Sequence, residues 1–171
     1  MSLPEPIWAR RLSSRSVIAI ATVGYIGYLK PGPGTWGSAV GVLFFARCFY
    51  NFSGLGNLTL SAILAGVAVA ICGEAEIRMK KKDPSEVVLD EVVAMPLCFF
   101  GWQLWQEIWP TWVILLAGFL VFRVFDITKP LGISRLQNLP GGWGVVIDDT
   151  AAAIATCITL HLAALGWRAL H

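Results

Sequence analysis

Long apolar segments, separated by short polar stretches, constrain this chain more than any other feature of its sequence. We interpret about five of them as membrane helices, at residues 37–52, 58–79, 83–105, 112–125 and 144–165. Of the 171 residues, 56% are hydrophobic and 14% are charged, whereas about 25% are charged in soluble domains. A helix satisfies its own backbone hydrogen bonds in lipid. The sequence therefore predicts an all-α fold, an integral membrane helical bundle with about five spanning helices.

The N-terminal region differs from these segments. The run from Ser16 to Leu29 is apolar, but two glycines interrupt it and it falls short of the ~20 residues that a span needs. We therefore expect an interfacial or re-entrant helix there, although a short true span fits the same residues. Trp8, beside two arginines, is typical of an anchor at the membrane surface.

Basic residues gather in two clusters near the ends of apolar segments. They are Arg10, Arg11 and Arg15, then Arg78, Lys80, Lys81 and Lys82. Such clusters favour the cytoplasmic face of a membrane and anionic lipid headgroups. The formal net charge of +2 is too small to indicate nucleic acid as a partner. The cysteines lie in separate apolar segments without a CxxC pair, so neither a zinc site nor a disulfide framework is supported.

A charged stretch from Phe122 to Asp149 interrupts the apolar pattern. It carries Arg123, Asp126, Lys129, Arg135, Asp148 and Asp149. Charges near membrane helices are costly unless they pair with one another or bind something. Carboxylates take a divalent cation, whereas Arg, Lys and backbone N–H groups take an anion. The alternation of acids and bases thus indicates a site for both, and a charged loop without function is the alternative.

A second polar motif, KPGPGTWGS, covers Lys30–Ser38. Its two prolines argue against a helix, and its glycines let a backbone approach a ligand closely. We expect Thr35 or Ser38 to cap the helix that follows. Free N–H groups at that helix start, with Lys30 nearby, would form a phosphate cradle. The motif lacks the GK[ST] of a P-loop, and a plain turn explains it equally well.

A third motif, DPSEVVLDE, covers residues 83–91. We expect Asp83 to cap a helix with Pro84 at its first position. Asp90 and Glu91 follow about two turns later among valines and leucines. Neighbours on a helix point about 100° apart, so one carboxylate would reach a metal while the other orients a ligand or a base. By contrast, we expect Glu74 and Glu76 simply to be solvated at a helix end.

Counting helices places these motifs together. Two apolar helices separate Lys30–Ser38 from the motif at 83–91, and two more separate that motif from Asp126. An even number of crossings returns the chain to the face it left. All the charged motifs therefore fall on one membrane face, which the basic clusters indicate is cytoplasmic.

Four motifs in this order resemble the phosphatidylglycerophosphatase A family. They are KPGPGTWGS at 30–38, DPSEVVLDE at 83–91, FRVFDITKP at 122–130 and GGWGVVIDD at 141–149. The resemblance covers most of the chain and implies a single membrane-embedded phosphatase domain over residues 1–171. It implies Mg²⁺-dependent removal of the terminal phosphate from phosphatidylglycerol phosphate, which gives phosphatidylglycerol and inorganic phosphate. It also implies a multi-pass protein of the bacterial inner (cytoplasmic) membrane, with its active site facing the cytoplasm.

The resemblance also assigns roles to residues. The implied catalytic carboxylates are Asp90, Glu91, Asp126 and Asp149. The implied metal ligands are Asp90, Asp126, Asp148 and Asp149. The implied phosphate contacts are Lys30, Thr35, Arg123 and Lys129. No role falls on Arg135.

The residues themselves favour the same chemistry. No histidine lies near the motifs, no cysteine sits in a phosphate loop ending in Arg, and no DxDx[TV] pattern occurs. Metal-assisted hydrolysis remains, with Mg²⁺ on carboxylates and basic side chains on the phosphate. Which carboxylate acts as the base stays open. The alternative is a non-catalytic membrane protein that binds or transports an anionic lipid or phosphate, although no internal repeat typical of transporters is visible. The expected partners are the lipid substrate and the bilayer, and a homo-oligomer is left open.

Overall fold

The computed structural model describes residues 6–130 and 132–171, and helices are its regular elements. The α-helices are α1 (Ser14–Ala21), α2 (Pro33–Phe44), α3 (Gly54–Met79), α4 (Leu89–Cys98), α5 (Thr111–Thr128) and α6 (Gly142–Leu170). The 3-10 helices are η1 (Ile7–Arg11), η2 (Ile26–Tyr28), η4 (Trp102–Leu104) and η5 (Ile133–Asn138). A π-helical turn, η3 (Phe45–Phe49), continues α2. The predicted all-α class is confirmed.

Three helices in the described part of the chain are long and apolar enough to cross a membrane. They are α3 with 26 residues, α5 with 18 and α6 with 29. The other two predicted spans are shorter, because α2 has 12 residues and α4 has 10. A straight crossing needs about 20 residues. Three of the five predicted spans therefore have the length and composition of a helix that could cross a membrane, whereas α2 and α4 do not.

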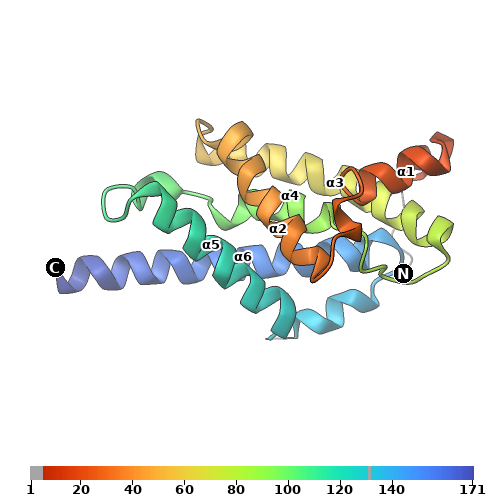
Figure 1. Cartoon of the computed structure of the whole chain (residues 1–171). Coiled ribbons are helices and arrows are strands. Elements are labelled where there is room, and N and C mark those ends of the chain that lie inside the picture. The colour runs from red at the N-terminus through yellow and green to blue at the C-terminus, as the bar shows by residue number, and fades with distance from the viewer. Residues whose placement is uncertain (1–5, 131) are drawn as a thin grey trace.

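The short helix α4 lies at the centre of the bundle, where it packs against α2, α3 and α6 (Figure 1). Eight of its ten residues are buried. Around it, large side chains such as Phe45, Phe99, Trp102 and Phe122 form a continuous core with no exposure above a few per cent. An element covered on several sides can bury side chains that point in different directions. This placement matters because α4 carries Asp90 and Glu91.

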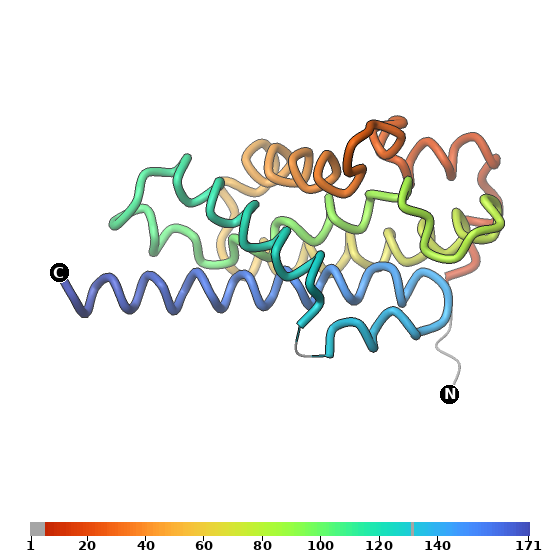
Figure 2. Tube along the Cα trace, turned by 60° about the horizontal axis from the view of Figure 1, so that its bottom comes forward, coloured from red at the N-terminus to blue at the C-terminus, as the bar shows by residue number. Residues whose placement is uncertain are grey.

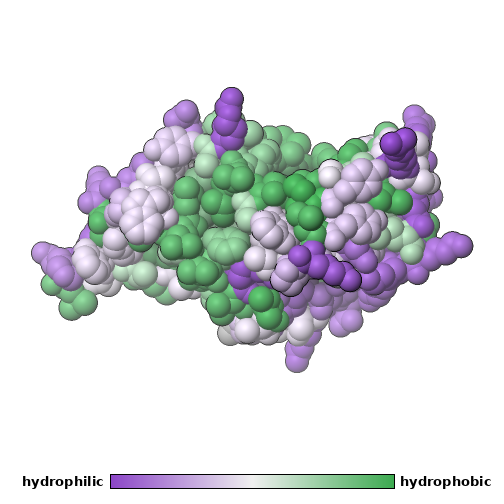
Figure 3. Space-filling view, in the orientation of Figure 1, coloured by the Kyte–Doolittle hydropathy of each residue, from purple (hydrophilic) through white to green (hydrophobic). Residues whose placement is uncertain are grey.

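The polar ends of several helices meet at one end of the molecule. The last turn of α3 and the first turns of α4 and α6 lie together there, while α6 runs the length of the bundle to the C-terminus at the opposite end (Figure 2). Hydrophilic residues gather at the same end, and hydrophobic ones cover the middle of the face shown in Figure 3. The helix count that placed the charged motifs together is thus consistent with the arrangement of the helices.

The N-terminal segment packs along the side of α3 rather than crossing the bundle. Helix α1 has eight residues and spans only about 12 Å, against a hydrocarbon core of about 30 Å. A turn and η2 follow it directly. Helix α1 is therefore too short to cross a membrane on its own.

Arg78, in the last turn of α3, fixes this N-terminal segment. Its Nη1 donates to the backbone oxygen of Leu12 at 2.8 Å and to Ser14 Oγ at 3.2 Å. Its Nε pairs with Glu74 Oε1 at 2.8 Å, and the Glu74 side chain is only 12% exposed. The prediction that Glu74 is solvated is therefore wrong. Glu76 is also engaged, since its Oε1 accepts a hydrogen bond from the backbone N–H of Asp83 at 2.6 Å.

Two helices begin at positions other than the predicted ones. Helix α2 begins at Pro33, inside the motif whose prolines argued against a helix, because a proline at the first helical position needs no N–H partner. Gly32 occupies the cap position without a side-chain bond, so the predicted cap by Thr35 or Ser38 is wrong. Helix α4 begins at Leu89 rather than near Asp83, which has a φ of +47°.

The cause of the second shift is a close contact between two loops. The backbone N–H of Val88 donates to the oxygen of Ala21 at 3.0 Å. A Cβ on Gly27 would lie 1.8 Å from the backbone oxygen of Glu86, so only glycine fits there. Residues 84–88 therefore run against the N-terminal segment as a turn. Helix α4 also ends at Cys98, well before the predicted limit near Trp105.

Candidate functional site

Three buried carboxyl groups converge between α4 and α6. Asp90 and Glu91 lie in the first turn of α4, and Asp149 lies on α6. Each offers one oxygen, and these oxygens lie within 4.8 Å of one another. Their residues are 7%, 9% and 4% exposed. Both neighbours on α4 thus reach one cluster, because helices cover α4 on several sides.

The unpaired oxygens of this acidic cluster fit a bound cation. Asp90 Oδ1 and Glu91 Oε2 are buried and have no hydrogen-bond partner among the residues that the structure describes. An uncompensated buried charge is strongly unfavourable. Carboxylate oxygens are the ligands that Mg²⁺ and similar hard cations prefer. Asp90, Glu91 and Asp149 could therefore hold a metal ion.

Arg123 of α5 joins this cluster to two neighbouring helices. Its Nη1 lies 2.5 Å from Asp126 Oδ2 and 4.0 Å from Glu91 Oε1. The same atom donates to Ser38 Oγ on α2 at 3.3 Å. The Arg123 side chain is only 16% exposed. A largely buried guanidinium therefore lies directly beside the acids.

Ser38 is a site residue that the sequence reasoning missed. The sequence predicts it only as a helix cap, yet it is fully buried and its Oγ donates to the backbone oxygen of Gly34 at 2.8 Å. That bond leaves the lone pairs of Oγ for Arg123. The available signal was the four-residue spacing between Gly34 and Ser38, which places a hydroxyl over the preceding turn. Nothing in the sequence named Arg123 as its partner.

The glycines of the KPGPGTWGS motif allow α2 to approach α4 closely. A Cβ on Gly34 would lie 2.4 Å from Glu91 Oε1, and one on Gly37 would lie 2.7 Å from Val88 Cβ. On the same face one turn later, a Cβ added to Gly41 would lie 2.7 Å from Met95 Cβ. Small residues at such spacing let two helices pack at short distance. These glycines therefore let α2 pack directly against α4 and the Glu91 side chain.

Lys129 and Asp148 form a second ion pair next to the acidic cluster. Lys129 ends α5 in a left-handed conformation, with φ of +42°, and its Nζ bonds Asp148 Oδ2. Burial acts to lower the pKa of Lys129, but the hydrogen bond and charge of Asp148 outweigh it and raise that pKa above its ordinary value. The ammonium therefore stays charged at neutral pH. Asp148 is buried, and its Oδ1 lacks a partner in the described residues.

The structure thus separates the predicted metal ligands. Asp90 and Asp149 lie in the three-residue cluster, where Glu91 joins them. Asp126 and Asp148 lie outside that group, each on a basic side chain. Asp126 is still close enough for its charge to act on Glu91 and Asp149. The geometry therefore favours one triad of candidate ligands with two acid–base pairs around it.

The remaining predicted phosphate contacts lie at the surface. Lys30 and Thr35 are exposed at the start of α2. The backbone N–H of Thr35 donates to the oxygen of Gly32 at 2.9 Å, and neither side chain is recorded in a hydrogen bond or ion pair within residues 6–130 and 132–171. Their side chains are thus available to a ligand that arrives from outside. Their predicted roles remain untested by these contacts.

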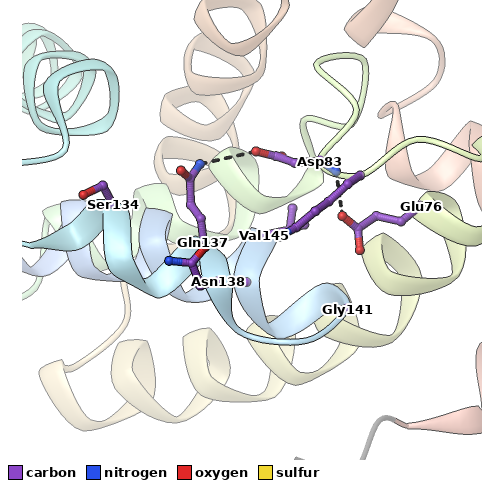
Figure 4. Close-up of a pocket in the computed structure, with 9 residues that line it drawn as sticks. Glu76, Asp83, Ser134, Gln137, Asn138, Gly141 and Val145 are labelled. Carbon is purple, nitrogen blue, oxygen red and sulfur yellow. Dashed lines mark hydrogen bonds between the residues drawn. The ribbon is translucent and has the colours of Figure 1, made fainter.

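A polar pocket of about 260 Å³ adjoins the site at the start of α6 (Figure 4). It is lined by Glu76, Lys82, Asp83, Ser134, Gln137, Asn138, Gly141, Gly144 and Val145. The sequence predicts no functional role for any of these side chains. They come from loops and helix ends, where apolar periodicity offers no signal.

Comparisons with known proteins cover most of the chain. The sequence profile described as Phosphatidylglycerophosphatase A matches residues 19–164. The Phosphatidylglycerophosphatase A of Haemophilus influenzae is 29% identical over 158 residues, or 88% of this chain and 91% of that protein. The one of Escherichia coli is 28% identical over 162 residues, or 92% and 89%.

A third relative matches a shorter region. The Putative phosphatidylinositol-3-phosphatase of Bacteroides thetaiotaomicron is 39% identical over 82 residues, which are 48% of this chain and 50% of that protein. No solved structure matches the chain. The matched profile includes all four charged motifs and every residue of the acidic cluster. The chain therefore belongs to the phosphatidylglycerophosphatase A family and is a membrane phosphatase of that family.

Proposed function

We propose that the chain is a Mg²⁺-dependent lipid phosphatase that removes the terminal phosphate of phosphatidylglycerol phosphate. The products are phosphatidylglycerol and inorganic phosphate, and residues 1–171 act as one membrane-embedded domain. The observation that carries the proposal is a buried triad of carboxylates with unpaired oxygens beside two basic side chains. The names of two relatives that match along nearly their whole length support the substrate.

The side chains divide into a metal-holding group and a phosphate-holding group. Asp90, Glu91 and Asp149 would hold Mg²⁺, which when bound polarises a phosphoryl group and lowers the pKa of a water. Arg123 and Lys129 neutralise the charge that develops on the phosphate oxygens. Asp126 and Asp148, predicted as ligands, instead orient these two basic groups through their ion pairs.

Hydrolysis needs a proton to move in each direction. A water oxygen attacks phosphorus, the bond from phosphorus to the glycerol oxygen breaks, and a carboxylate of the triad accepts the water's proton. The protonated carboxyl group then gives that proton to the leaving glycerol oxygen, which becomes a hydroxyl group, and the carboxylate is restored. Burial of the triad keeps other water away from the reacting phosphorus.

Lys30 and Thr35 are proposed to meet the phosphate as it enters. Both side chains are exposed near the start of α2. Pro33 has no N–H, and the N–H groups of Thr35 and Trp36 both donate to the oxygen of Gly32. The donors to the entering phosphate are therefore the Lys30 ammonium and the Thr35 hydroxyl. These residues increase the affinity for substrate more than they alter the chemical step.

The test of this function is phosphate release from phosphatidylglycerol phosphate by the purified chain in detergent. We expect many turnovers per protein with Mg²⁺, a stop on addition of EDTA, and recovery when Mg²⁺ is restored. A protein that binds or transports an anionic lipid would instead release no phosphate. Turnover that persists unchanged in EDTA, after the metal has been removed, would contradict the metal dependence.

We propose a bacterial inner-membrane location, with the charged end of the bundle facing the cytoplasm. Arg78, Lys80, Lys81 and Lys82 lie at that end, at the close of α3, and such residues are retained on the cytoplasmic side. In this proposal α2 with η3, and α4 with the turn that follows it, are two shorter crossings beside the three long helices. The total of five crossings places the C-terminus on the periplasmic side.

The orientation gives a direct expectation for labelling. A cysteine added after His171, in a chain whose exposed Cys48 is replaced by serine, should react with a membrane-impermeant maleimide in intact spheroplasts. A cysteine in place of the exposed Lys81 should react only after the membrane is opened. Reaction of both positions from the same side would contradict an odd number of crossings.

A further inference from the structure

The polar pocket beside α6 has groups that the proposed catalysis does not use. Its polar lining consists of Glu76, Lys82, Asp83, Ser134, Gln137 and Asn138. Figure 4 shows side chains of η5 on one side and Asp83 with Glu76 on the other. Three separate elements thus enclose it, namely the end of α3 with the following turn, η5, and the first turn of α6.

Part of this lining is fixed by hydrogen bonds. Gln137 Nε2 donates to Asp83 Oδ2 at 3.3 Å, and the backbone N–H of Asp83 donates to Glu76 Oε1 at 2.6 Å (Figure 4). These contacts hold Asp83 in its left-handed conformation, at φ of +47°. Within residues 6–130 and 132–171, the side chains of Ser134, Asn138 and Lys82 make no hydrogen bond or ion pair. The pocket therefore combines hydrogen-bonded side chains on one side with unpaired donors and acceptors on the other.

The pocket is lined by both acidic and basic side chains, which determines the kind of ligand it can bind. A phosphate would face the carboxylates of Glu76 and Asp83, which would repel it. A metal ion would face the ammonium of Lys82 and the positive end of the α6 dipole. A neutral hydroxyl group can donate to a carboxylate and accept from an amide or an ammonium. The lining is therefore complementary to an uncharged polyol.

The pocket lies one helical turn from the site. Gly144 and Val145 line it, and Asp148 and Asp149 follow four residues later on the same faces of α6, about 6 Å along the axis. Asp83 is close enough for its charge to act on Asp148. A group bound in the pocket therefore lies about one helical turn from Asp148, whose partner Lys129 is proposed to hold the phosphate.

We propose that this pocket binds the hydroxyl-bearing glycerol unit next to the reacting phosphate of the lipid substrate. The inference rests on the proposed function and adds to it a specificity-determining subsite. In phosphatidylglycerol phosphate this unit links the two phosphates and carries one free hydroxyl group. The pocket distinguishes this substrate from lipid phosphates whose terminal phosphate is not attached to a hydroxylated linker.

The test compares two substrates that differ by that hydroxyl group. One is phosphatidylglycerol phosphate, and the other has propane-1,3-diol in place of the linking glycerol. We expect kcat/KM of the unaltered protein to favour the hydroxylated substrate by about tenfold, the scale of a hydrogen bond left unmade in a site built for it. Gln137→Leu and Asn138→Leu should reduce this preference towards one. Gln106→Leu is the matched control, since Gln106 is exposed and bonds Tyr50 elsewhere in the bundle.

Each outcome decides between the proposals. Equal kcat/KM for both substrates overturns the subsite and leaves the phosphatase function intact, whereas no release from either substrate overturns the function itself. If the variants keep the kcat/KM preference for the hydroxylated substrate, another part of the protein recognises the hydroxyl group, and the subsite is also overturned. If Gln137→Leu fails to fold because Asp83 loses its partner, Ser134→Ala and Asn138→Ala give the answer, since neither breaks a recorded bond.

Discussion

Replacing Asp149 with asparagine is expected to lower kcat for phosphate release by at least about a thousandfold, and Asp90→Asn should act similarly. A metal ion supplies several kcal/mol of transition-state stabilisation, and each 1.36 kcal/mol is worth about tenfold in rate. An amide has nearly the same shape as a carboxylate but lacks its charge, so it binds Mg²⁺ far more weakly. Both variants therefore remove a ligand without opening a cavity. The measurement is phosphate release at saturating substrate over a series of Mg²⁺ concentrations.

Two further measurements, the stability of the metal-free protein and the effect of Mg²⁺ on its Tm, distinguish a loss of catalysis from a loss of folding. The acids of the triad lie within 4.8 Å of one another and repel, so one neutral amide should leave the metal-free protein at least as stable. Mg²⁺ should raise the Tm of the unaltered protein and have little effect on either variant. Glu107→Gln is a matched control, because Glu107 is exposed and pairs with Arg168 away from the site. Full activity in both aspartate variants would remove the triad from the mechanism.

The sequence was most informative where lipid restricts the alternatives. A span must be apolar and helical, so α3, α5 and α6 follow from residue type alone. For the same reason Asp90 and Glu91 stood out, because an unpaired acid in an apolar helix is costly. Glu91 was expected to diverge from Asp90 on α4, yet both reach the triad. Their convergence depends on how many helices surround α4, which no local pattern specifies.

The contacts that required the structure involve residues distant in sequence. Ser38 and Arg123 are 85 positions apart, and their bond depends on the crossing of α2 and α5. The turn at residues 83–88 replaced a predicted helix start because its backbone packs against the N-terminal segment. Gln137 lies in a polar connection and bonds Asp83 across 54 positions. Helical propensity and apolar spacing describe neighbours within a few turns, so they do not report these pairs.

Replacing Arg123 with glutamine should lower kcat/KM by at least about a hundredfold, the loss typical when one fixed donor to a developing oxyanion is removed. The guanidinium is largely buried and lies beside Ser38, Asp126 and Glu91. Its Nε is buried without a partner among the described residues, which leaves a donor for a phosphate oxygen. Arg123→Lys should recover only part of the rate, because an ammonium cannot present two parallel donors. Arg168→Gln at an exposed pair is the control.

A purely structural role for Arg123 predicts a different pattern. If it served only to offset the charge of Asp126, the double variant Arg123→Gln with Asp126→Asn would recover activity together with stability. A role in binding phosphate predicts that this double variant regains Tm but stays as slow as Arg123→Gln alone. Ser38→Ala should cost only about two- to tenfold, since it removes one hydrogen bond that positions the guanidinium. The measurements are steady-state kcat and KM and the Tm of the unaltered protein, Arg123→Gln, the double variant and Ser38→Ala. They separate the two roles, because only a phosphate contact keeps the rate low when the charge balance is restored.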